Sequence, residues 1–312
     1  TGAVAYVLAW RSDAQSRPLT LARARNDAVA AQAASELKNE LALSACLDKS
    51  WAIRSTGSVL GAGSVVLLYD DADILALDKL APHALTIACF FKLAPQLAQV
   101  VACLHGAGLV HRNISPSCFF VDVDHSANQE ADYRVRIGGF GLTAAMPEPG
   151  QQDNITALLR GDLPYMSPEH SGRTRRPVDA RSDLYSLGVI FYRLLTGHLP
   201  FGVTDVANDA AEWMHFHIAS EPVAPHLLNK MVPDRLSDLV MRLLKKNPEH
   251  RHQSAAQLLA DLDQCRITLQ PHADTASVAD KPALPSLPAP LPRDMRSHRM
   301  HQAMQHYHAG DY

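Results

Sequence analysis

Cysteine is scarce in this sequence, and the few cysteines follow no pattern. The 312 residues include 5 of them, with no C-x-x-C pair and no His/Cys cluster of zinc spacing. We therefore expect buried free thiols in a reducing compartment, which predicts a cytoplasmic protein. The cysteines are Cys46, Cys89, Cys103, Cys118 and Cys265.

Long apolar runs and an excess of basic charge are also missing. No run approaches the roughly 20 apolar residues of a membrane helix, so we expect no membrane segment in this chain. The formal net charge of −3 argues against nucleic acid or an acidic membrane surface as a partner. Thr1 opens a strand-like run rather than a signal peptide, and the missing initiator Met indicates a fragment.

What is present divides into a β-rich part over residues 1–71, a helical part over 72–268, and a tail over 269–312. The length and the 47% hydrophobic content allow two lobes with a sizeable core. The tail is rich in Pro and His, cannot bury a core, and reads as a linker or a disordered segment. Its histidines could bind a metal, but their irregular spacing favours a solvated role: His298, His301, His306 and His308.

Propensities and turn signals predict the individual elements. Strands are predicted over residues 3–11, 18–24, 51–55 and 64–70, with a turn "TGS" between the last two, and a hairpin over 118–123 and 133–138. Helices are predicted over residues 27–46, 87–105, 181–195, 209–220, 234–246 and 254–265. Pro95 either begins or kinks the second helix, and Ser254 is suited to cap the last one.

Five motifs in order resemble a Ser/Thr-type protein kinase domain. "LVHRNISPSCFFVD" (residues 109–122) resembles the catalytic loop H-R-D-x-x-x-x-N, and "IGGFGL" (137–142) lies where D-F-G is expected. "GDLPYMSPEH" (161–170) resembles the end of an activation segment, with "SPE" for A-P-E. "DARSDLYSLGVIFYRLLTGHLPF" (179–201) and "LLKKNPEHRHQSAAQLLADL" (243–262) resemble the central and final helices of the large lobe.

This resemblance covers about residues 1–268 and implies an α+β, bilobal fold whose first strand is truncated here. Two stretches are similar to a narrower group, the kinase-like domain at the N-terminal end of hybrid sensor histidine kinases. They are "GDLPYMSPEHSGRTRRPVDARSDLYSLGVIFYRLLTGHLPF" and "HIASEPVAPHLLN".

The resemblance also shows which catalytic positions are substituted. Asn113 stands for the catalytic base, and a neutral amide cannot accept a proton. Ser115 stands where Ser/Thr kinases carry a lysine, and Cys118 replaces an asparagine that holds Mg²⁺. Gly139 replaces the D-F-G aspartate and offers no side chain to a metal. Asp162 is expected on the far side of the activation segment, where it cannot substitute.

The nucleotide pocket implied by the resemblance is vestigial. The first glycine of the Gly-rich loop would precede residue 1, Gly2 is the glycine that remains within residues 1–7, and Ala22 occupies the position of the strand lysine. Glu40 matches the helix glutamate, with Glu36 as a second choice, but without its lysine Glu40 reads as a surface or lobe-contact residue. Tyr69 is the fourth residue assigned to this vestigial nucleotide pocket, with Gly2, Ala22 and Glu40.

The structural positions, by contrast, are kept. His111 and Arg112 remain in the loop, and Asp183 resembles the aspartate that braces it. Glu169 and Arg251 resemble the buried ion pair that fixes the activation segment to the large lobe.

The leading hypothesis is therefore a pseudokinase that serves as a regulatory or interaction module of a larger signalling protein. Its expected partners are proteins or other domains of the same chain, with no Mg²⁺ as cofactor and ATP binding left open. The rival is an active or weakly active Ser/Thr kinase, and a third reading is an ATP-binding switch without catalysis.

Overall fold

The computed structural model describes residues 4–10, 18–24, 30–61, 64–69, 75–80, 83–124, 132–147, 161–201 and 210–269. Gly2 and the tail with its four histidines lie outside the described residues. The three domain ranges stay predictions.

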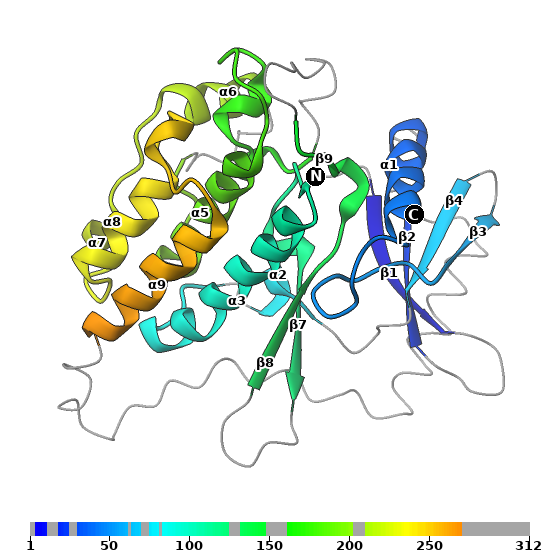
Figure 1. The fold of residues 1–312 in the computed structure, drawn as a ribbon, viewed down its shortest axis with the longest axis horizontal. Coiled ribbons are helices and arrows are strands. Elements are labelled where there is room, and N and C mark those ends of the chain that lie inside the picture. Colours follow the sequence, from blue (N-terminus) through cyan, green and yellow to red (C-terminus); the bar gives the residue numbers. More distant parts are fainter. Residues whose placement is uncertain are drawn as a thin grey trace.

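The small lobe is a four-stranded antiparallel sheet with one helix, at the right of Figure 1. The strand order is β1-β2-β4-β3, and the helix α1 packs against β4 through a small core of Leu37, Ile53, Leu67 and Tyr69. The elements are β1 (Val4–Trp10), β2 (Pro18–Ala24), α1 (Ala30–Leu43), β3 (Gly57–Gly61) and β4 (Ser64–Tyr69).

Short strands from Leu75 onward form two further sheets. One sheet has the order β5-β7-β8, and β6 pairs with β9. The predicted hairpin is confirmed, because β7 and β8 pair antiparallel from Phe119↔Ile137 to Asp124↔Asp132. The elements are β5 (Leu75–Ala76), α2 (Leu77–Leu80), β6 (Leu109–Val110), β7 (Phe119–Asp124), β8 (Asp132–Ile137) and β9 (Ala144–Ala145).

The large lobe is built around α5, of which 13 of 17 residues are buried. A helix that is buried on all sides belongs at the centre of a lobe, and α3, α7 and α8 pack around it while α9 covers α3 (Figure 1). The helices are α3 (Ile87–Gly106), α5 (Ala180–Thr196), α6 (Ala210–Ala219), α7 (Pro225–Leu228), α8 (Asp234–Leu243) and α9 (Ala255–Leu269).

Three sequence expectations need correction. Residues 51–55 form no named strand: they make one bridge from Ala52 to Ile137, and the strand that pairs with β4 is β3, which includes part of the predicted turn. α3 begins at Ile87 and includes Pro95, so the alternative in which this helix starts at Pro95 is wrong, while the predicted span of 87–105 is confirmed. α3 also has the length and apolar composition of a membrane span, contrary to expectation, although half of its most apolar window is buried inside the protein.

Gly188 sets how closely α5 and α8 approach. A Cβ at this position would lie 2.6 Å from the Cβ of Leu243, closer than real Cβ contacts. We expect Gly188→Ala to lower the free energy of unfolding by about 1–3 kcal/mol, measured by urea denaturation, because the helices must separate. Gly106→Ala is the matched control, since no atom lies within 4 Å of its Cβ. An equal effect of the two changes would contradict the packing.

Candidate functional site

The loop after β6 is held by one buried carboxylate. Asp183, on α5 and 1% exposed, accepts the backbone N–H of His111 at 2.8 Å and that of Arg112 at 2.9 Å. The Nε2 of His105 donates to the same carboxylate at 2.9 Å. Burial opposes ionisation of Asp183, but the bond from His105 and the charges around it outweigh burial, so its pKa is lowered. The loop is therefore fixed by a charged anchor.

Asn113 is held in place by the end of the activation segment. Its Oδ1 accepts the backbone N–H of Asp162 at 2.9 Å. Gly161 allows this approach: its φ is +95°, and a Cβ there would lie 2.1 Å from Asn113 Oδ1. The expectation that Asp162 lies away from the loop is therefore wrong, because the two chain segments are hydrogen-bonded to each other.

Cys118 is a buried, neutral thiol. Its Sγ donates to the carbonyl of Asn113 at 3.1 Å, and Ser115 Oγ lies 3.7 Å from the Sγ. Burial raises the pKa of Cys118 to about 12, against which the bonds to Ser115 are a smaller opposing effect. At physiological pH this residue therefore offers a protonated sulfur and not a thiolate.

Gly139 turns the chain before the phenylalanine of the motif. It has a φ of +80° and precedes the turn η3 (Phe140–Leu142). Phe140 is fully buried, with its ring 5.6 Å from the ring of His111 and 6.5 Å from that of Trp51. The His111 Nε2–H donates to the carbonyl of Gly138 at 3.1 Å, and burial lowers the pKa of His111. The hydrophobic half of the motif is thus kept while its carboxylate is absent.

On α1, Glu40 is not at the surface. It is 2% exposed, and the hydroxyl of Tyr69 donates to its Oε1 at 2.7 Å. Ala22, the position of the expected lysine, lies on β2 in register with Leu67 of β4. Glu40 and Tyr69 are thus brought together within the small lobe, which corrects the surface reading of Glu40.

Asn39 joins the two lobes and was missed by sequence reasoning. Its Nδ2 lies 3.3, 3.0 and 2.9 Å from the carbonyl oxygens of Phe140, Gly141 and Thr143 and donates to them. Gly141 permits the contact, since a Cβ there would lie 2.8 Å from the Cβ of Glu36. The one available signal was an amide side chain next to Glu40 on a helix expected to face the cleft.

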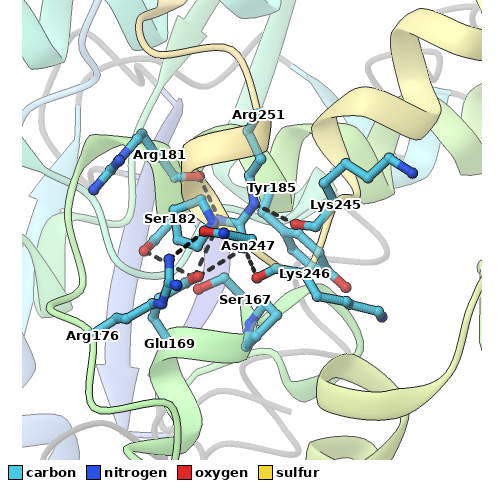
Figure 2. A network of polar contacts seen from close by, with 12 residues as sticks. Ser167, Glu169, Arg176, Arg181, Ser182, Tyr185, Lys245, Lys246, Asn247 and Arg251 are labelled. Atoms are coloured by element: carbon cyan, nitrogen blue, oxygen red, sulfur yellow. Dashed lines mark hydrogen bonds and ion pairs between the residues drawn. The ribbon is translucent and has the colours of Figure 1, made fainter.

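A second anchor lies beneath the activation segment, in the network of Figure 2. The guanidinium of Arg251 bonds both carboxylate oxygens of Glu169, at 2.8 and 3.2 Å, and neither side chain is more than 1% exposed. Arg251 also donates to three carbonyls, and Ser182 Oγ donates to Glu169 at 3.3 Å. Both charges are therefore fully hydrogen-bonded despite their burial. The three carbonyls belong to Arg181, Lys245 and Lys246.

No metal centre is visible among the described residues. No three His, Cys, Asp or Glu side chains there are gathered closely enough to hold an ion. Asp122, the last residue of the motif that resembles the catalytic loop, lies on β7 and is half-buried.

The chain folds into a β-rich small lobe and a helical large lobe, with the loop after β6 held by Asp183. These features define a bilobal domain of the protein kinase type. The family model "Protein kinase domain" matches residues 1–262, and the chain belongs to this family. The predicted family and the predicted bilobal α+β fold are confirmed.

Curated relatives match parts of the chain. Hybrid signal transduction histidine kinase G of Dictyostelium discoideum is 49% identical over 105 residues, which are 34% of this chain and 3% of that protein. Serine/threonine-protein kinase PknB of Mycolicibacterium smegmatis is 33% identical over 159 residues, 51% of this chain and 23% of that kinase. A probable serine/threonine-protein kinase of Streptomyces coelicolor is 33% identical over 182 residues, 58% of this chain and 25% of that protein. The chain thus spans a quarter or less of these relatives.

The Glu169–Arg251 pair gives a stability prediction. Glu169→Gln leaves the Arg251 guanidinium buried without a counter-charge, so we expect the free energy of unfolding to fall by about 3–5 kcal/mol in urea denaturation. Asp263→Asn removes the carboxylate of the exposed pair with Arg266 and should cost less than about 1 kcal/mol. Similar losses in the two variants would show that the buried pair is no anchor.

His217 gives a pH prediction. The Nδ1 of His217 accepts the hydroxyl of Tyr185 and its Nε2–H donates to the Leu163 carbonyl, each at 3.0 Å, and burial lowers the pKa of His217 to about 3. Below about pH 6.5 this histidine is protonated in the unfolded chain but stays neutral in the folded chain. The free energy of unfolding therefore declines as the pH falls from 6.5 toward 3, by up to about 1.4 kcal/mol per pH unit. His217→Gln should flatten unfolding free energy against pH in that window. An unchanged slope would contradict the assignment.

Proposed function

We propose that this domain keeps the protein kinase architecture without useful phosphoryl transfer and acts as a regulatory or interaction module. The observation that carries the proposal is the chemistry of the two metal-holding positions. Gly139 has no side chain, and Cys118 is a buried thiol whose proton is bonded to the carbonyl of Asn113. Kinases depend on Mg²⁺ at these positions to neutralise the transferred phosphoryl group.

The residues present do not fit Mg²⁺. This ion takes oxygen ligands in near-octahedral geometry, and a protonated sulfur is a poor substitute for a carboxylate or amide oxygen. The mismatch supports a domain that does not use the metal. Nucleotide binding that is independent of metal is compatible with the proposal, whereas Mg²⁺-dependent binding is not.

The remaining catalytic positions support the same reading. The Asn113 amide is neutral, and its oxygen is already bonded to the Asp162 N–H. Glu40 is bonded to Tyr69, while a phosphate-holding lysine would need it as a partner. These groups act as one unit in a kinase, so their separate losses do not multiply. Together they leave little that could stabilise the transition state.

The relatives support a module within a larger signalling chain. One of them is named a hybrid signal transduction histidine kinase, and the matched part is 3% of that protein. By analogy, the partners proposed for this domain are other domains of its own chain or further signalling proteins, in the cytoplasm.

One observation favours the rival, an active or weakly active Ser/Thr kinase. Asp162 lies beside Asn113 and brings a carboxylate-bearing residue to the loop that has lost its own. Two of the relatives are also named serine/threonine kinases.

Two measurements separate these readings. For the wild-type chain with ATP, we expect no Mg²⁺-dependent rise in melting temperature and no incorporation of labelled γ-phosphate. The Cys118→Asn, Gly139→Asp double variant restores two oxygen ligands, and its melting temperature should rise with Mg²⁺ and ATP, by the equivalent of about 2.7 kcal/mol at 100 times Kd. Asp tolerates the positive φ at 139 better than most residues, and circular dichroism checks folding.

The proposal fails if the wild-type chain is itself stabilised by ATP only when Mg²⁺ is present. It also fails if the wild type incorporates phosphate and Asn113→Ala or Asp162→Asn abolishes the incorporation. Loss in Asp162→Asn alone would assign the base to Asp162.

A further inference from the structure

A loop of the large lobe exposes three arginines that have no carboxylate partner among the described residues. Arg173, Arg175 and Arg176 follow the turn η5 (Pro168–Ser171), and all three are exposed. Within the part of the chain that the structure describes, Arg176 bonds only to the side-chain oxygen of Asn247, and the guanidinium groups of the other two have no partner. The positive charge of this loop is therefore available to solvent or to another molecule.

The acidic residues next to this loop are already occupied. Asp179 binds the guanidinium of Arg181 through both oxygens, the shortest distance being 2.7 Å, and Glu249 binds the same group at 2.9 Å. Arg181 is thus the ion-pair partner of both Asp179 and Glu249. The surface has an excess of positive charge in a chain whose formal net charge is −3.

The loop stands on a fixed base. The backbone N–H of Arg173 donates to Ser171 Oγ at 3.1 Å, and the Asn247 oxygen that meets Arg176 also accepts the N–H of Glu249 at 3.0 Å. Figure 2 shows Arg176 beside the buried pair of Glu169 and Arg251. The arginines are thus presented by the same rigid layer that anchors the activation segment, which lowers the entropic cost of binding.

Arg175 is held in a backbone conformation that disfavours it. Its φ is +55°, in the left-handed region where glycine or asparagine is far more favourable than a long side chain. An exposed position gains nothing in packing from an arginine there. Strain retained at an exposed charged residue favours a role for its guanidinium outside the fold.

We propose that Arg173, Arg175 and Arg176 form a recognition surface for an acidic protein segment rich in Asp and Glu. Guanidinium groups match carboxylate and phosphate oxygens in a two-pronged geometry, and arginine clusters recognise both. This inference rests on the proposed function, because it names the kind of partner that an interaction module would bind.

The test uses the full chain and two fluorescent ten-residue peptides of Glu and Ser, one with phosphoserine. We expect saturable, salt-sensitive binding of the peptide without phosphoserine by fluorescence anisotropy. The Arg173→Gln, Arg175→Gly, Arg176→Gln variant should bind about 10-fold more weakly, as expected for three exposed charge pairs. Lys230→Gln, which removes an exposed cation elsewhere, should bind like the wild type. Binding of both peptides supports recognition of an acidic segment through its negative charge, whereas binding of the phosphorylated one alone overturns that assignment.

The single variant Arg175→Gly distinguishes a binding role of Arg175 from a purely structural role. It should raise the melting temperature by relieving the positive φ while weakening peptide binding. The inference is overturned if neither peptide binds saturably, if Lys230→Gln weakens binding equally, or if the chain binds vesicles of anionic lipid and neither peptide. Labelled phosphate transferred from ATP to a bound peptide would contradict the proposed function and leave this surface standing.

Discussion

The loop that would carry catalysis keeps its shape because the buried carboxylate of Asp183 accepts the backbone N–H groups of His111 and Arg112. The activation segment keeps its place because the Glu169 carboxylate meets Arg251 in the interior of the large lobe. Both anchors use charges that are satisfied by the protein itself. Neither requires a nucleotide or a metal, so the architecture can persist after the reactive groups are lost.

The substituted positions are absorbed into the same internal bonding. Cys118 donates to the Asn113 carbonyl, Asn113 accepts from Asp162, and Glu40 accepts from Tyr69. In an active kinase the corresponding groups are directed at phosphates, metal or substrate. Here the bonds point back into the protein, and Asn39 ties the small lobe to the segment 140–143. On the outer surface, Arg173, Arg175 and Arg176 are exposed, which is consistent with a role in recognition.

The sequence predicted the family, the two lobes and most helices, because the motifs of the large lobe are nearly intact. It failed at residues 51–55, whose apolar residues pack on β8 through a single bridge and not in a full ladder, since local pattern cannot distinguish the two. It also misplaced Asp162 and missed Asn39. Both contacts join residues about 50 to 100 positions apart, and no local periodicity encodes such pairs.

We propose that, within the described residues, the positions of Cys118 and Gly139 offer no oxygen ligands able to hold a divalent cation. Electron paramagnetic resonance of Mn²⁺, which prefers the same oxygen ligands as Mg²⁺, tests it directly in the presence of ATP. The account predicts that adding the protein leaves the Mn²⁺–ATP spectrum unchanged, while the Cys118→Asn, Gly139→Asp variant broadens it. A protein-bound Mn²⁺ signal in the wild-type chain, at micromolar concentrations and with ATP required, would contradict the account.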